Sequence, residues 1–154
     1  MKPPRLTVEL VPATAWYTNV RSNVSKEEWD RLRKIAYAEA RYICEICSGQ
    51  GSKWPVECHE LWEYDDESYT QTLLRLIALC PKCHEVKHIG RASTQGNFPR
   101  VLQHLAEINE WTLEEAEEYV AIQFMIWRER SKYEWKLDIL ILNDYGEING
   151  GKKT

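Results

Sequence analysis

The sequence predicts a single α+β domain, in which helices and terminal strands flank a small cysteine-rich core. Two Cys-x-x-Cys pairs enclose two segments with strand-like patterns, and helix-capping patterns precede apolar residues at helical spacing elsewhere. The length of 154 residues, with 44% hydrophobic and 29% charged residues, suits one globular domain. No repeat or low-complexity tract interrupts the pattern, so we expect one unit spanning residues 1–154.

The N-terminal part contains one strand candidate and one helix candidate. Arg5–Val11 alternates between apolar and polar residues and ends at Pro12, which predicts a half-buried strand. Ser25 followed by Glu28 forms a capping-box pattern, after which apolar residues recur at helical spacing. We therefore expect a helix over about Lys26–Arg41.

Residues 42–90 are expected to form the core. Val56–Tyr64 alternates like a strand and ends at a turn signal. Leu73–Leu79 is a second strand candidate, although its apolar run also fits a buried helix. A short helix should then run over about Pro81–Ile89 and end at Gly90.

Residues 99–142 are expected to form a helical extension with a closing strand. Pro99–Ile108 has a helical pattern, and the capping box Thr112–Glu115 introduces a longer helix to about Lys132. Trp135–Leu142 looks like a closing strand that could pair with the N-terminal strand candidate. One sequence does not fix that pairing.

The location of the protein is expected to be the cytoplasm, with no membrane segment. No apolar run approaches the eighteen or so residues needed to cross a bilayer, and the start of the chain lacks a signal-peptide pattern. The five cysteines are an odd number, which favours metal binding over disulfides in a reducing compartment.

Charge is unevenly distributed along the chain. The formal net charge of −4 argues against a wholesale polyanion binder. Segment 71–100 nevertheless holds five basic residues and a single acidic one, Glu85. A bound nucleic acid would therefore be expected at this central segment.

The two Cys-x-x-Cys pairs have the spacing of a structural zinc site. Each turn brings two thiolates within reach of one ion, and two turns complete a tetrahedral sulfur shell. Redox dithiols and plain buried cysteines are the alternative interpretations. The expected zinc ligands are Cys44, Cys47, Cys80 and Cys83.

The helix after the last of these cysteines carries two histidines. His84 and His88 lie at i and i+4 on one helical face, which can hold a second metal ion. The segment also spells His-Glu-x-x-His, the metallopeptidase motif in which Glu85 would be the general base. A zincin, however, carries this motif within a long helix, whereas Gly90 is expected to end this helix almost at once.

Cys58 and His59 stand side by side on the preceding strand candidate. Once four cysteines are assigned to zinc, Cys58 is free to bind the second ion together with His84 and His88. His59 could then act as general base on a water molecule. The alternative is a small buried thiol beside a hydrogen-bonded surface histidine.

This pattern resembles the zinc-knuckle branch of the HNH endonucleases, whose fold is the ββα-metal motif. The resemblance covers Cys-x-x-Cys, a histidine on a strand, and Leu-Cys-x-x-Cys-His-x-x-x-His, from roughly Tyr42 to Gly90. It implies that His59 is the general base and that Cys58, His84 and His88 hold one divalent ion, either Mg²⁺, Mn²⁺, Ni²⁺ or Zn²⁺. The four knuckle cysteines match the structural Zn²⁺.

Two positions depart from the family pattern. Arg75 stands where the family has a central asparagine, and Cys58 stands where it usually has aspartate or histidine. An arginine cannot accept a hydrogen bond, but Arg75 could clamp the scissile phosphate as a bidentate donor. A thiolate at Cys58 would favour zinc over magnesium.

The resemblance implies hydrolysis of phosphodiester bonds in DNA. Lys82, Lys87 and Arg91 would contact flanking phosphates, although they also fit an ordinary solvated helix face. The alternative is a catalytically degenerate zinc-binding module of the same fold that recognises DNA or protein. A homodimer or a protein partner is left open.

Overall fold

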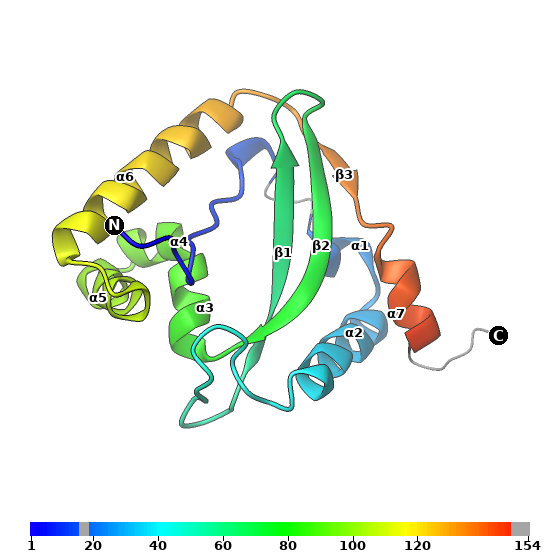
Figure 1. Cartoon of the computed structure of the whole chain (residues 1–154). Helices are drawn as coiled ribbons and strands as arrows, with labels where there is room; N and C mark the ends of the chain where they lie inside the picture. The colour runs from blue at the N-terminus through cyan, green and yellow to red at the C-terminus, as the bar shows by residue number, and fades with distance from the viewer. Residues whose placement is uncertain (16–18, 149–154) are drawn as a thin grey trace.

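The computed structural model describes residues 1–15 and 19–148 as an α+β structure with a small three-stranded sheet. Figure 1 shows a long β-hairpin in the middle, with helices on both sides. The elements are η1 (Ala13–Ala15), α1 (Val20–Asn23), α2 (Lys26–Glu39), β1 (Glu57–Asp65), β2 (Thr70–Leu79), α3 (Pro81–Lys87), α4 (Ile89–Thr94), α5 (Phe98–Asn109), α6 (Leu113–Arg130), β3 (Lys136–Asp138) and α7 (Leu142–Ile148).

The hairpin of β1 and β2 is antiparallel and carries a bulge. His59 pairs with Ile77, and Leu61 pairs with Arg75, whereas Trp62 pairs with Leu73. The extra residue between these last two pairs, Leu74, is exposed. A bulge of this kind changes which face the following side chains occupy.

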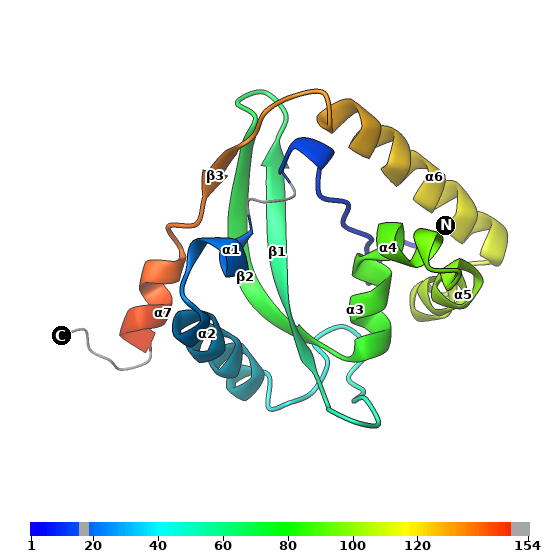
Figure 2. The same ribbon diagram turned by 180° about the vertical axis from the view of Figure 1, so that it is seen from behind.

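Two hydrophobic clusters lie on opposite sides of the hairpin. One joins the N-terminal segment to the end of β2 and to α3, α4, α5 and α6. The other joins α1, α2 and α7 to the middle of β2. Figure 2 shows the same separation from behind, with α2 and α7 on one side of the hairpin and α3 to α6 on the other. The hairpin is therefore covered by helices on both faces.

Local sequence signals place most helices correctly. Ser25 caps α2 by accepting a hydrogen bond from the Glu28 backbone, as predicted. Both hydrogen bonds of the Thr112–Glu115 capping box form at the start of α6. Gly90 does not end the helical region, because α4 begins one residue earlier, at Ile89.

The prediction of a strand over Arg5–Val11 was wrong. Leu6 and Val8 are buried, as the alternation implied. The backbone, however, bonds to helices: the amides of Arg5 and Leu6 donate to Asn109 Oδ1, and that of Glu9 donates to the Lys87 carbonyl. An extended segment can satisfy its backbone without joining a sheet.

The closing strand is shorter than predicted and has a different partner. Only Lys136–Asp138 is a strand, and it pairs in parallel with β2 at Thr70 to Thr72. The rest of the predicted strand turns into α7. Its apolar residues Ile139 and Ile141 pack on the α2 side of the hairpin. No helix among the described residues has the length and apolar character needed to cross a bilayer.

Candidate metal centres

The four knuckle cysteines come together at the base of the hairpin. Their Sγ atoms lie within 4.8 Å of one another. Cys80 follows β2 directly and caps α3, so that its Sγ accepts a hydrogen bond from the Cys83 amide. The Cys44 amide donates to the Gly49 carbonyl, which closes the first turn. Four sulfur atoms in this arrangement suit a tetrahedral Zn²⁺ ion.

The ionisation of these thiols also favours a cation. A hydrogen bond from Cys83 lowers the pKa of Cys44 to about 4, whereas burial raises the pKa of Cys80 to about 11. One thiolate therefore suppresses the ionisation of its neighbours, since like charges repel. A divalent ion would allow all of them to ionise.

Three histidines form a second cluster, on the α3 side of the hairpin. His59 comes from β1, His84 from α3, and His88 caps the end of α3. One ring nitrogen of each lies within 4.8 Å of the others, and the Nε2 atoms of His84 and His88 are 3.1 Å apart. The ring of His59 meets both others edge-on, with centroids 5.3 and 5.4 Å away. This set can hold one divalent ion.

Two carboxylates support two of these rings. Glu57 Oε1 lies 2.7 Å from His84 Nδ1, and Glu9 Oε1 lies 2.7 Å from His59 Nε2. An ionised carboxylate only accepts hydrogen bonds, so each of these ring nitrogens donates. The other nitrogen of each ring then carries the lone pair, which is the form that binds a metal ion; on His84 this is Nε2, the atom that lies 3.1 Å from His88 Nε2.

Burial keeps the helix histidines neutral. Burial is the main cause that lowers the pKa of His88 to about 3, and the charges of His84 and His59 when protonated contribute to the same shift. The pKa of His84 is also lowered by burial, although Glu57 partly opposes this. A neutral imidazole offers its lone pair at neutral pH, so protons compete weakly with an ion here.

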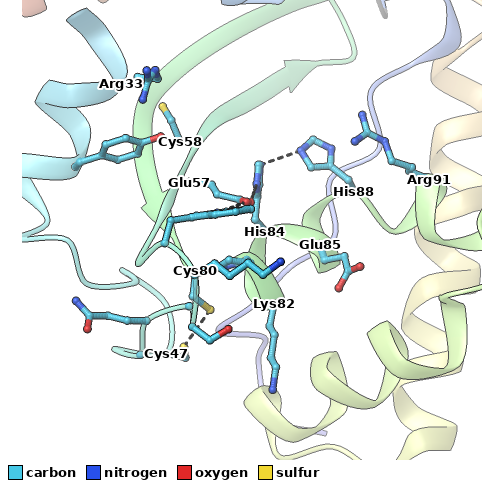
Figure 3. Close-up of a pocket in the computed structure, with 18 of the residues that line it drawn as sticks. Arg33, Cys47, Glu57, Cys58, Cys80, Lys82, His84, Glu85, His88 and Arg91 are labelled. Atoms are coloured by element: carbon cyan, nitrogen blue, oxygen red, sulfur yellow. Dashed lines mark hydrogen bonds and ion pairs between the residues drawn. The ribbon is translucent and has the colours of Figure 1, made fainter. Parts of the chain in front are cut away.

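A broad groove of about 1120 Å³ passes His84 and His88. It runs between α2 and the α3 to α5 region, and Figure 3 shows His84, Lys82 and Arg91 on its α3 and α4 wall. Seven of its lining residues are basic and three are acidic. The basic residues are Arg21, Lys26, Arg33, Lys53, Lys82, Arg91 and Arg100. The groove thus carries positive charge although the chain as a whole is negative.

Cys58 is not brought into the histidine cluster. Successive side chains on a strand point to opposite faces, and Cys58 packs against the hydrophobic cluster on the α2 side that contains Leu32 and Leu73. Figure 3 shows its sulfur directed toward Arg33. Burial raises the pKa of this thiol to about 12, so it remains protonated at neutral pH. His59, from the opposite face, takes its place in the cluster.

Lys87 is not available to contact DNA. Its side chain is only 3% exposed, and Nζ donates to Thr7 Oγ1 and Glu9 Oε2 at 2.7 and 2.8 Å. The N-terminal segment covers this face of α3. Lys82 and Arg91, by contrast, are exposed on the wall of the groove.

Two other candidate residues are engaged elsewhere. Arg75 pairs with Glu45 at 2.9 Å and does not line the groove that passes His84 and His88. Glu85 accepts hydrogen bonds from the two terminal guanidinium nitrogens of Arg100, at 2.7 and 2.8 Å. This pairing does not favour Glu85 as the general base of a peptidase.

Two residues around these clusters were missed by the sequence analysis. Glu9 sits in the segment interpreted as a strand, and nothing local connects it with His59. His104 lies with its Nε2 3.3 Å from Cys83 Sγ, so it can donate a hydrogen bond to a thiolate of the cysteine cluster. Its position one helical turn after Arg100 carries no signal of that contact.

Comparison with known proteins found no match, whether with protein-family models, with curated proteins or with solved structures.

Proposed function

We propose that this protein is a metal-dependent endonuclease of the HNH type that hydrolyses phosphodiester bonds in DNA. The observation that carries the proposal is the cluster of His59, His84 and His88, which lies beside a groove rich in basic residues. A metal ion can activate water and stabilise the leaving oxygen, and basic side chains can bind the phosphate backbone, so the two features together suit phosphodiester hydrolysis.

The order of elements supports this assignment. β1 and β2 form a hairpin, α3 follows directly, and the cysteine cluster ties the start of α3 to residues 44–47. In our proposal this is a ββα-metal core, with Zn²⁺ held by the four cysteines as its structural ion. Zinc bound there would fix the angle between hairpin and helix, and thereby the distance between His59 and the helix histidines.

His84 and His88 would hold the second ion, which could be Mg²⁺, Mn²⁺, Ni²⁺ or Zn²⁺. When bound, such an ion polarises a phosphate oxygen and stabilises the charge of the leaving oxygen. Glu57 orients His84 through Nδ1. His59, with Nε2 donating to Glu9, has Nδ1 available to take a proton from the attacking water.

The groove would position the DNA backbone. Lys82 and Arg91 flank the histidines on one wall, and Arg21 and Lys53 lie on other parts of the lining. These side chains can contact successive phosphates regardless of sequence. Arg75 has no part in this proposal, because it is bound to Glu45.

A plasmid-nicking assay tests the proposal. The purified chain should nick supercoiled plasmid in at least one of Mg²⁺, Mn²⁺, Ni²⁺ and Zn²⁺, and His59→Ala should lower the rate at least about 100-fold, as expected for loss of a general base. Cys58→Ala is the matched control, since it changes the adjacent residue on the opposite face and should retain activity. Nicking that survives His59→Ala would contradict the proposal.

The alternative is a degenerate module that binds DNA or protein without cleaving. The pairing of Arg75 with Glu45 favours it, because the side chain at the family's asparagine position is engaged by a carboxylate. It predicts that the folded, metal-loaded chain cuts no plasmid in any of the four metals.

A further inference from the structure

Glu9 connects the N-terminal segment to the histidine cluster. Its Oε1 lies 2.7 Å from His59 Nε2, and its Oε2 lies 2.8 Å from Lys87 Nζ. Its two partners are almost fully buried, with His59 4% and Lys87 3% exposed. Burial alone would raise the pKa of Glu9, but its hydrogen bonds and ionic contacts with His59 and Lys87 lower it overall. The carboxylate is therefore ionised and can only accept.

The backbone around Glu9 is fixed as firmly as its side chain. The Glu9 amide donates to the Lys87 carbonyl, and Thr7 Oγ1 accepts from Lys87 Nζ. A second attachment lies at Arg5 and Leu6, just upstream of Glu9 in the chain. Asn109 accepts hydrogen bonds from the amides of both residues and donates one to the Leu6 carbonyl. The segment is thus attached to α5 at one point and to α3 at another, with Glu9 directed at His59.

We propose that Glu9 is a positioning residue that holds His59 in the tautomer with the proton on Nε2, so that the Nδ1 lone pair is free for the chemistry of the site. The contribution of Glu9 to hydrolysis rests on the proposed nuclease function. Its effect on the tautomer of His59 does not depend on that function. Glu57 does the same for His84 through the opposite nitrogen, Nδ1.

The two oxygens of Glu9 make the proposal specific. A carboxylate can accept from His59 and from Lys87 at once, but an amide has one oxygen and one NH₂ group. In Glu9→Gln the amide oxygen should turn to the charged Lys87, which is the stronger donor. The NH₂ group then faces His59 Nε2 and favours the tautomer with the proton on Nδ1.

Long-range ¹H–¹⁵N correlation spectra of the ¹⁵N-labelled full chain, at mildly alkaline pH, test this directly. The wild type should show His59 protonated at Nε2, and Glu9→Gln should move the proton to Nδ1. Glu57→Gln is the matched control: it should leave the His59 signals in place and change those of His84. Circular dichroism of each variant checks that the fold is retained.

Two further measurements separate positioning from mere packing. Lys87→Met keeps the Glu9 to His59 contact, so its His59 tautomer should match the wild type even if its stability falls. In the nicking assay Glu9→Gln should lower kcat by about 10- to 100-fold with little change in KM, the usual range for loss of a carboxylate behind a functional histidine.

The outcomes distinguish this proposal from the nuclease proposal. An inactive wild type with His59 protonated at Nε2 would contradict the nuclease function and leave the role of Glu9 standing. A folded Glu9→Gln with an unchanged His59 tautomer would overturn the role of Glu9, as would a wild type protonated at Nδ1.

Discussion

The salt dependence of DNA binding is the most quantitative prediction from the groove. Three of its seven basic residues, Lys26, Arg33 and Arg100, already form ion pairs with Asp30 or Glu85. The remaining four form no ion pair with a described residue, and they are Arg21, Lys53, Lys82 and Arg91. These four are the side chains free to neutralise phosphates.

Each neutralised phosphate of duplex DNA contributes about −0.9 to the slope of log affinity against log salt concentration. Four contacts give a slope of about −3.6, so the affinity should fall on the order of 100-fold between 50 and 200 mM salt. Lys82→Gln and Arg91→Gln should each reduce the slope by about 0.9. Fluorescence anisotropy with a labelled duplex measures the affinity at each salt concentration. All proteins carry His59→Ala, so that the duplex is not cleaved during the titration.

Lys136→Gln is the matched control, because Lys136 is exposed on β3 and does not line the groove. Its slope should equal that of the parent protein. The reasoning is refuted if removing Lys82 and Arg91 leaves the slope unchanged, or if Lys136→Gln reduces it equally.

Three other predictions concern the site and the fold around it. Cys58→Ala should lower the free energy of unfolding by about 1 kcal/mol. Elemental analysis should find the same number of metal ions per chain as in the wild type; the loss of one ion would mean that Cys58 is a metal ligand after all. Without an ion at the histidines, the free energy of unfolding should fall as the pH drops from about 6.5 toward 3. In this range His88 takes up a proton in the unfolded chain but not in the folded one, where burial helps to lower its pKa to about 3. Urea titrations at several pH values should show this, with a shallower dependence in His88→Gln; an equal dependence would contradict it. Asn109→Ala removes three hydrogen bonds to residues 5 and 6 and should cost about 2–4 kcal/mol in urea unfolding, and a loss well below 1 kcal/mol would mean that this anchor is unimportant.

The parts of the fold that the sequence predicted depend on local signals. Capping boxes predict α2 and α6, and a helical pattern predicts α5. The hairpin follows from two strand patterns around a turn. The approach of the four knuckle cysteines follows from the two Cys-x-x-Cys turns, because each turn fixes two sulfurs. Such features depend on residues close together in the chain.

The errors arose where contacts between distant residues decide the outcome. Lys87 looked like a surface residue of a short helix, and it is buried because residues 7–9 cover that face of α3. The strand prediction for Arg5–Val11 failed for the same reason, since its amides donate to Asn109 and to the Lys87 carbonyl instead of to a strand. No pattern within either segment reveals these partners.

Cys58 was a different kind of error. The strand over residues 56–64 was itself predicted from alternation, and alternation places neighbouring side chains on opposite faces. His59 and Cys58 could therefore not both face one ion on α3. The structure resolves the choice in favour of His59, which joins His84 and His88.

The central claim is that two separate metal centres lie at the base of this hairpin. Anomalous diffraction from crystals grown with Zn²⁺ or Mn²⁺ measures this most directly. We predict two peaks per chain, one among the sulfurs of Cys44, Cys47, Cys80 and Cys83 and one among the rings of His59, His84 and His88. A single peak at the sulfurs, with the histidines bonded only to each other and to Glu9 and Glu57, would contradict the claim.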